Sequence, residues 1–476
     1  MNLLNSKKKG SRHYLLFKYG MLLLLIVSAS CSNTDDYTPL VPEEDEELSG
    51  GSATSFIFSP DAFGFSVDGL SLDDQITFGV GNSLFNQSWV TAPASTIARD
   101  GLGPFFNARS CSGCHFKDGR GRPPAFEGEL AHGLLLRLTL PGIGVNGGTI
   151  PDPIYGGQFQ DNSVFGIDRE GILRVTYETV AVTYPDGGSV DLQKPIYEMI
   201  DLNYGAMNAA VQVSPRVANQ MIGLGLLDAI PEAVLLSYED ENDADDDGIS
   251  GRPNYVYDVE TANLKLGRFG WKANQPTVKQ QVAAAFSGDL GITSSLFPEE
   301  NCNPELNCDE ISNGGSPEIP DENLDNVAFY AATLSVPARR DFDNEEVLQG
   351  KELFNSINCS GCHIATFETG AYAIDALANQ TIRPYTDLLL HDMGDALSDG
   401  APEFRATGNE WRTPPLWGVG LIKTVNDHTN LLHDGRARNI EEAILWHGGE
   451  AEAIKNSFMA LNKEERTKII AFIETL

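Results

Sequence analysis

The sequence predicts a mainly α-helical fold made of two related units, of which the first carries a β-rich insertion. The pentapeptide Cys-Ser-Gly-Cys-His occurs at residues 111–115 and again at 359–363. A similar segment precedes each copy, Gly-Asn-Ser-Leu-Phe at 81–85 and Gly-Lys-Glu-Leu-Phe at 350–354, and this repetition indicates two copies of one structural unit. Between the two pentapeptides the apolar pattern changes to that of strands.

The predicted insertion lies in the first unit. Residues 134–140, 172–184 and 189–200 have the composition and pattern of strands. Pro-Asp-Gly-Gly at 185–188 predicts the turn of a hairpin between the second and the third of them. Residues 206–238 are then expected to return to helix.

Helices are predicted before the second pentapeptide and at the C-terminus. The segment 343–346 is acidic, which favours a helix N-terminus, and apolar residues follow at helical spacing. Asn439 with Glu442, and Asn462 with Glu465, form capping-box patterns. These elements support a small helical unit around the second pentapeptide.

Composition and charge narrow the class of protein. The 476-residue chain is 41% hydrophobic and 21% charged, which is typical of a globular protein of two or three domains. Its 67 acidic and 33 basic residues give a formal net charge of −34. This charge argues against nucleic-acid binding, because phosphate contacts need clustered Lys and Arg. It fits a soluble protein that meets small molecules or basic partners.

The first thirty residues predict export. They contain five basic and no acidic residues, then an apolar run at 21–27 and small residues at 28–30. This order is typical of a signal peptide, and the apolar run is too short to span a bilayer. Cys31 follows at once, as in the lipobox of bacterial lipoproteins. We therefore expect lipid at Cys31 and a location at a membrane of a Gram-negative-type envelope, facing the periplasm or the cell surface; the alternative is an ordinary cleaved signal.

Residues 31–55 are expected to form an acidic, disordered tether. They include two prolines, five consecutive acidic residues at 43–47 and a Ser/Gly run at 49–52. Such a segment has little apolar surface to bury.

The two pentapeptides match the attachment site of c-type haem, Cys-x-x-Cys-His. The two thiols bond the haem, and the adjacent His binds the iron. A thioredoxin-like redox pair does not need the His, and a zinc site favours closely spaced pairs, so two covalent haems are the preferred interpretation. The predicted attachment residues are Cys111, Cys114, Cys359 and Cys362, with His115 and His363 as ligands of the first and second irons. We expect cytochrome c-like haem domains at 56–330, including the insertion, and at 331–476.

Two other segments carry possible sites. Cys302 and Cys308 are expected to form a local disulfide in an oxidising compartment, with two free thiols as the alternative. Asp243, Asp245 and Asp247 alternate as in the first half of an EF-hand calcium loop. The position that should carry the final Glu is occupied by Asn254, so this is either a calcium site or a solvated acidic loop.

The sixth ligand of each iron decides whether it relays electrons or binds a substrate. Met393 lies thirty residues after His363 in the same unit, and we assign it to the second iron; a Met that only fills the core is the alternative. His132 is a candidate distal ligand of the first iron, although it could equally be a surface or core residue. His433 is expected to serve the haem pocket by hydrogen bonding or by pairing with a propionate.

Five stretches of the chain resemble the di-haem oxidoreductases, a family often labelled thiol oxidoreductases and related to bacterial di-haem cytochrome c peroxidases and to MauG. The matching stretches are residues 101–110, 268–273, 390–394, 410–418 and 432–437. The resemblance covers about residues 56–476. It implies a peroxidase-like enzyme, whereas the β-rich insertion departs from the peroxidases and leaves substrate and donor open.

The resemblance also implies a division of labour between the haems. The haem held by His363 and Met393 would accept electrons from a donor cytochrome or another small redox protein. The haem held by His115 would reduce hydrogen peroxide to water. A tryptophan between the haems would be Trp271 or Trp89, and no residue stands out as the catalytic acid or base. A non-enzymatic electron carrier or redox sensor, and MauG-like oxidation of a partner protein, are the alternative functions.

Overall fold

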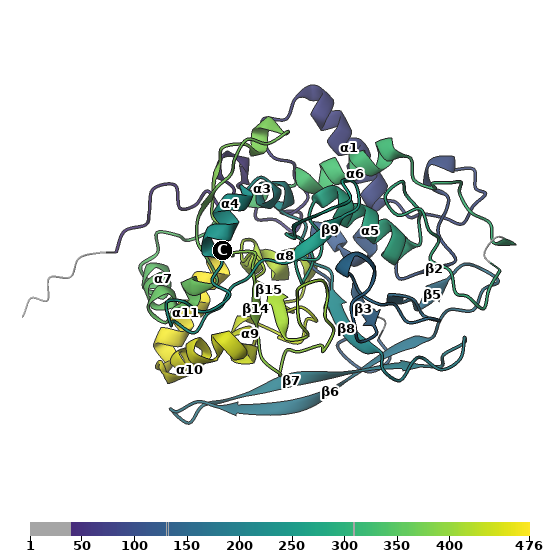
Figure 1. Cartoon of the computed structure of the whole chain (residues 1–476). Coiled ribbons are helices and arrows are strands. Elements are labelled where there is room, and N and C mark those ends of the chain that lie inside the picture. Colours follow the sequence, from purple (N-terminus) through teal and green to yellow (C-terminus); the bar gives the residue numbers. More distant parts are fainter. Residues whose placement is uncertain (1–39, 130, 132, 308–309) are drawn as a thin grey trace, which may run out of the picture. The chain divides into compact units, whose positions relative to one another are not determined.

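The computed structural model combines helices with short strands (Figure 1). Most of its longer helices follow a residue whose side chain caps them. The structure describes residues 40–476 except 130, 132, 308 and 309. The predicted capping box of Asn462 and Glu465 is confirmed in both directions. At Asn439 the cap is formed, but the Glu442 side chain binds Arg438 instead of closing the box.

The helices pack in pairs and small groups. Their bounds are α1 Leu72–Asn86, α2 Cys111–Cys114, α3 Leu224–Asp228, α4 Glu232–Leu235, α5 Val278–Leu290, α6 Asp321–Ala332, α7 Glu345–Ser356, α8 Ile422–Asn426, α9 Ile440–Trp446, α10 Glu452–Ala460 and α11 Lys463–Thr475. Within the described part of the chain, none of them has the length and apolarity that a membrane span requires.

The strands form several small sheets, and this corrects the expected fold class. The bounds are β1 Thr54–Ser55, β2 Phe105–Phe106, β3 Leu134–Thr139, β4 Gln158–Phe159, β5 Asn162–Ser163, β6 Ile172–Thr183, β7 Ser189–Ile200, β8 Gln212–Val217, β9 Tyr255–Asp258, β10 Asn263–Leu266, β11 Val336–Pro337, β12 Phe367–Glu368, β13 Thr381–Ile382, β14 Leu390–Asp392 and β15 Glu410–Arg412. With 29% helix and 19% strand, the protein is not mainly α as predicted. Many strands have only two to four residues, which is too short for a recognisable alternating pattern.

The predicted hairpin is confirmed, whereas the helix expected over 206–238 is wrong in its first half. Strands β6 and β7 pair antiparallel from Ile172–Ile200 to Thr183–Ser189. Residues of β8 pair instead with β3, in the three-stranded sheet β4-β3-β8. Only the short helices α3 and α4 follow. Pro215 lacks a backbone N–H and would break a helix at this point.

The repeated glycines allow two pairs of helices to pack closely. A Cβ atom on Gly81 of α1 would lie 2.1 Å from the carbonyl oxygen of Asn326 in α6. A Cβ atom on Gly350 of α7 would lie 2.0 Å from the carbonyl oxygen of Lys468 in α11. Both are far below van der Waals contact, so only glycine fits at these crossings. The internal repeat seen in the sequence therefore corresponds to the same helix crossing formed twice.

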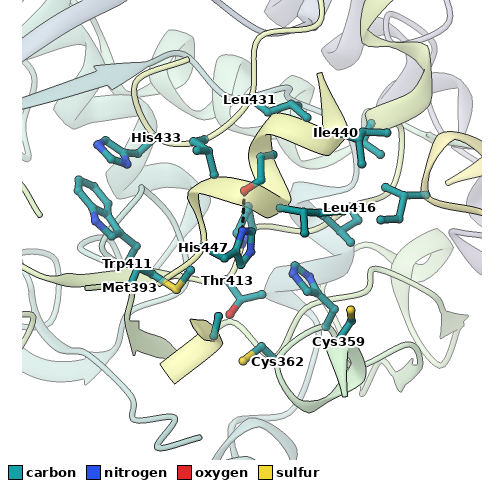
Figure 2. Close-up of a pocket in the computed structure, with 18 of the residues that line it drawn as sticks. Cys359, Cys362, Met393, Trp411, Thr413, Leu416, Leu431, His433, Ile440 and His447 are labelled. Carbon is teal, nitrogen blue, oxygen red and sulfur yellow. Dashed lines mark hydrogen bonds between the residues drawn. The ribbon is translucent and has the colours of Figure 1, made fainter. Parts of the chain in front are cut away.

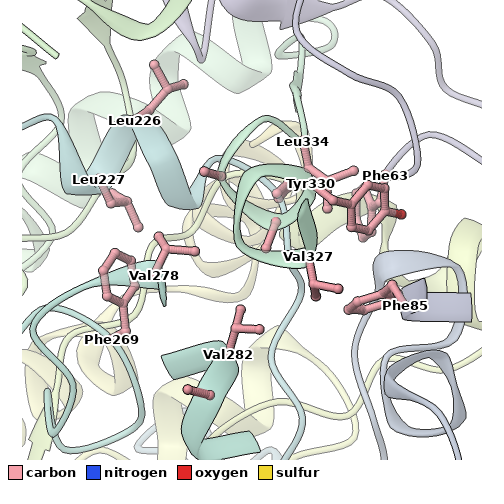
Figure 3. Packing of buried hydrophobic residues seen from close by; sticks show 14 of the residues in the cluster. Phe63, Phe85, Leu226, Leu227, Phe269, Val278, Val282, Val327, Tyr330 and Leu334 are labelled. Atoms are coloured by element: carbon pink, nitrogen blue, oxygen red, sulfur yellow. The ribbon is translucent and has the colours of Figure 1, made fainter. Parts of the chain in front are cut away.

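Each helix crossing belongs to its own apolar cluster, although Leu40–Leu476 form one compact unit. The first cluster surrounds α1, α5 and α6 and includes Phe85, Val282 and Tyr330 (Figure 3). The second surrounds α7, α9 and α11 and includes Phe354 and Phe472. The two crossings thus lie in separate hydrophobic environments.

Residues 40–55, expected to belong to a disordered tether, pack against the rest of the structure instead. Glu46 is buried and forms ion pairs with Arg339 and Lys351. Strand β1 pairs in parallel with β11. Composition alone favoured disorder, but a buried carboxylate is stable when cationic groups compensate it. Cys31 and the predicted signal peptide lie outside the described residues.

Candidate functional site

Each of the two pentapeptides borders its own cavity. The first cavity is bordered by Cys111, Cys114 and His115, and the second by Cys359, Cys362 and His363. Each cavity has a volume of about 190 Å³, and the equal sizes fit two copies of one cofactor.

The histidine of each pentapeptide is oriented by a backbone carbonyl. The Nδ1 atom of His115 lies 2.7 Å from the oxygen of Asn219, and that of His363 lies 3.0 Å from the oxygen of Tyr385. A carbonyl can only accept, so Nδ1 carries the proton and Nε2 has its lone pair free. This is the usual arrangement of a histidine that binds metal.

Burial keeps the same side chains neutral. It lowers the pKa of His115, and it lowers the pKa of His363 to about 4, where the nearby His447 also contributes to the lowering. Burial raises the pKa of the Cys111 and Cys359 thiols to about 12. These two thiols are therefore protonated and poor nucleophiles at neutral pH.

A phenylalanine of each repeat packs near the histidine. The rings of Phe85 and His115 are 6.1 Å apart, and those of Phe354 and His363 are 6.2 Å apart. Phe85 and Phe354 follow Gly81 and Gly350 by one helical turn. The helix crossing and the cavity are thus parts of the same repeated unit.

The second cavity is lined mainly by apolar side chains, together with sulfur and imidazole groups (Figure 2). Met393 follows β14, whose pairing with β15 fixes its position. His447 follows the last residue of α9, and its Nδ1 atom lies 2.7 Å from the carbonyl oxygen of Ala443. His433 stacks on Trp411, with ring centroids 3.7 Å apart. His433 therefore lies in the second cavity, as expected for a pocket residue.

The first cavity is more polar. One face of α5 presents Gln281, Ala285 and Asp289 to it, at intervals of four residues. Asp289 is the only carboxylate among the described residues that line either cavity. Buried amide oxygens of Gln220, Asn274 and Gln275 also lie here, and none of them has a hydrogen-bond partner among the described residues.

Three guanidinium groups at the cavities suit an anionic ligand. Arg120 lines the second cavity, Arg137 the first and Arg412 both, and within the described residues none of them forms an ion pair. Burial lowers the pKa of each, and that of Arg120 and Arg412 falls to about 10. Buried cations need a compensating charge. Haem propionates would supply it, so the residues present fit two haem groups.

Trp271 lies between the cavities. It lines both of them, and its Nε1 atom donates to the carbonyl oxygen of Val217 at 2.8 Å. Trp89 packs in the first apolar cluster against Phe286 and borders neither cavity. Of the two tryptophans considered from the sequence, Trp271 is therefore the one positioned between the candidate haem sites.

The acidic loop brings together a different trio from the predicted one. Carboxylate oxygens of Asp240, Asp243 and Asp245 lie within 4.8 Å of one another. Asp247 instead accepts hydrogen bonds from the backbone of Ile249 and from Asn358. Calcium binding here stays a prediction.

Several predicted residues fall outside the described part of the chain. His132 is one of them, so its proposed role at the first iron stays a prediction. Cys302 is disulfide-bonded, but Cys308 is also outside the described residues and the predicted pairing is not described.

Sequence reasoning missed the cavity roles of His447, Asp289 and Arg137. Each is isolated in the sequence and reaches its cavity only through tertiary packing. The only available signal was the four-residue spacing of Gln281, Ala285 and Asp289 on a helix face.

Comparison with known proteins gives one match. The model of a family described as "Di-haem oxidoreductase, putative peroxidase" matches residues 44–135 and 147–476. No curated protein and no solved structure matches the chain.

Proposed function

Because the chain belongs to the di-haem oxidoreductase family, we propose that it is an exported enzyme that reduces a peroxide with electrons from a small redox protein. Two covalently attached haems would be held at Cys111, Cys114 and His115, and at Cys359, Cys362 and His363. Haem iron supplies one-electron and oxygen chemistry. The observation that carries the proposal is the contrast between a polar first cavity and an apolar second one.

The second cavity suits electron entry. Met393 would complete a His/Met ligand set with His363, which gives a relatively high potential and no free coordination position. Its lining contains no carboxylate among the described residues, so it offers little for proton transfer. Electrons would arrive here from a donor cytochrome or a similar small protein, which the acidic surface would attract if the donor is basic.

The first cavity suits peroxide reduction, because splitting an O–O bond requires protons at defined positions. The Asp289 carboxylate accepts a hydrogen bond from the Gln158 amide at 2.8 Å, which holds it in place. We assign it the role of receiving and returning a proton at its oxygen atoms. The amide oxygens of Gln220, Asn274 and Gln275, which have no partner among the described residues, would orient the polar substrate or water.

Trp271 would connect the two sites. Its indole lines both cavities, and the guanidinium of Arg120 lies 5.0 Å from the ring. A cation over the face of an indole fixes the ring. The ring would therefore hold the two redox groups at a constant separation and provide the path between them.

Two further features of the proposal are a lipid anchor and a calcium site. Lipid at Cys31 would attach the enzyme to a membrane, and calcium at the acidic loop would tie together backbone near the second cavity.

The experiment is to add hydrogen peroxide to the half-reduced, two-haem protein and to follow both haems by absorption spectroscopy. Loss of one electron equivalent from each haem, with peroxide consumed, supports the proposal. If the irons do not react while electrons pass freely between them, the protein is an electron carrier or sensor. If the protein oxidises an added partner protein but does not reduce peroxide with electrons from a donor, the result would favour a MauG-like role.

A further inference from the structure

We propose that His447 is a reserve ligand of the second haem iron, able to replace Met393. This inference rests on the second haem of the proposed function, but not on the peroxidase activity. No sequence motif marks the His447 side chain. With it, the second iron would have two alternative sixth ligands, Met393 and His447.

Hydrogen bonding argues against two of the described histidines, His391 and His428, as metal ligands. Both ring nitrogens of His391 face carboxylates, Nε2 of Asp387 at 2.7 Å and Nδ1 of Glu450 at 2.8 Å. Both ring nitrogens of His428 are also occupied, by the carbonyl of Arg120 and the backbone N–H of Asn430. Neither ring can present a free lone pair without breaking these bonds.

His447 instead has the arrangement of the two pentapeptide histidines. In His115, His363 and His447 alike, Nδ1 lies within 3.0 Å of a backbone carbonyl, and Nε2 has no hydrogen-bond partner among the described residues. The carbonyl partner of a metal-binding histidine fixes its tautomer and its ring orientation. The tautomer and the carbonyl-bound Nδ1 of His447 therefore match those of the two histidines that are expected to bind iron.

His447 and Met393 border the same cavity from abutting loops (Figure 2). A Cβ atom on Gly448 would lie 3.1 Å from the carbonyl oxygen of Met393. One on Gly449 would lie 2.2 Å from the oxygen of Asp392. Glu450 ties the loops together, since its carboxylate accepts from the backbone N–H of Asp392 at 2.9 Å.

Because the loops are fixed to each other, the exchange would involve movement of the flexible Met393 side chain and not of the loops. One iron–sulfur coordinate bond is replaced by one iron–nitrogen bond. No electron is transferred, and no proton is released because Nε2 is unprotonated in this tautomer. A second imidazole in place of the thioether lowers the reduction potential of the haem, so the exchange would oppose electron entry.

The test uses the full-length protein with both haems and the variants Met393→Ala and Met393→Ala/His447→Ala. We expect the single variant to keep a six-coordinate, low-spin second haem with the magnetic resonance signature of two imidazoles and a lower midpoint potential. The double variant should become high-spin. The matched control Met393→Ala/His433→Ala removes another imidazole of the same cavity and should stay low-spin.

A high-spin second haem in Met393→Ala, with two haems per chain still bound, overturns the inference and leaves the proposed function intact. If alanine causes loss of the haem, Met393→Leu fills the volume and is assessed by the same criterion. A wild-type protein that binds fewer than two haems would instead contradict the proposed function itself.

Discussion

Replacing Gly350 with alanine should destabilise the second haem unit, because it forces apart two helices at their closest point. The added Cβ would lie 2.0 Å from the Lys468 carbonyl oxygen and 2.9 Å from Cβ of Phe472. The helices must separate by about 1 Å or more to reach van der Waals contact. Overpacking of this kind costs up to about 3 kcal/mol, and the better helix propensity of alanine returns about 1 kcal/mol. We expect a net loss of about 2 kcal/mol.

The effect should extend to the haem. Phe354, one turn after Gly350, packs against both Phe472 and His363, so separation of the helices disturbs the ring beside the predicted iron ligand. The assay compares denaturant midpoints by circular dichroism and the spectrum of each haem. The control is Gly79→Ala, on the exposed face of α1, where an added Cβ atom would have no neighbouring atom within 4 Å. This control should be neutral or slightly stabilising. A Gly350→Ala protein as stable as the wild type would refute the reasoning.

Three further predictions test other parts of the molecule. Trp271→Phe should slow electron transfer from the second haem to the first in rapid mixing, whereas Trp89→Phe, in the apolar cluster, should not; equal rates in all three proteins would rule out a path through the indole. Asp289→Asn should lower peroxide turnover by about 10²- to 10⁴-fold, the usual contribution of a positioned acid or base, with unchanged haem content; full activity would remove Asp289 from the mechanism. Glu46→Gln should cost about 3–5 kcal/mol in unfolding free energy, as breaking a buried ion pair does. Burial alone would raise the pKa of Glu46, but its basic partners hold it below the ordinary 4.5, so this stabilisation is present above pH 4.5 and is lost as the pH falls further. The variant should therefore show a weaker loss of stability in acid, and an unchanged acid profile would contradict the assignment.

The parts of the site that could be predicted are those encoded by neighbouring residues. Cys111, Cys114 and His115 lie within five positions, and the structure places all three at one cavity. The repeat was visible because Gly81 and Gly350 each satisfy a local requirement at a helix crossing. Features that depend on neighbouring residues can therefore be predicted from the sequence.

The rest depends on contacts between distant segments. His447 acquires its orientation from Ala443, but its cavity is completed by residues of several other elements. Asp289 is one acidic residue among 67 acidic residues, and only the packing of α5 identifies it. The fold class was wrong for a similar reason, because strands of two or three residues such as β14 exist only through their partners.

The burial of Glu46 has a practical consequence for producing the protein. A soluble version that starts after the acidic segment, at residue 56, would remove the Glu46 carboxylate, the described ion-pair partner that Arg339 and Lys351 share. Cleavage before Leu40 would retain it. The N-terminal boundary chosen for recombinant expression thus decides whether the protein is obtained with the ion pairs of Glu46 to Arg339 and Lys351.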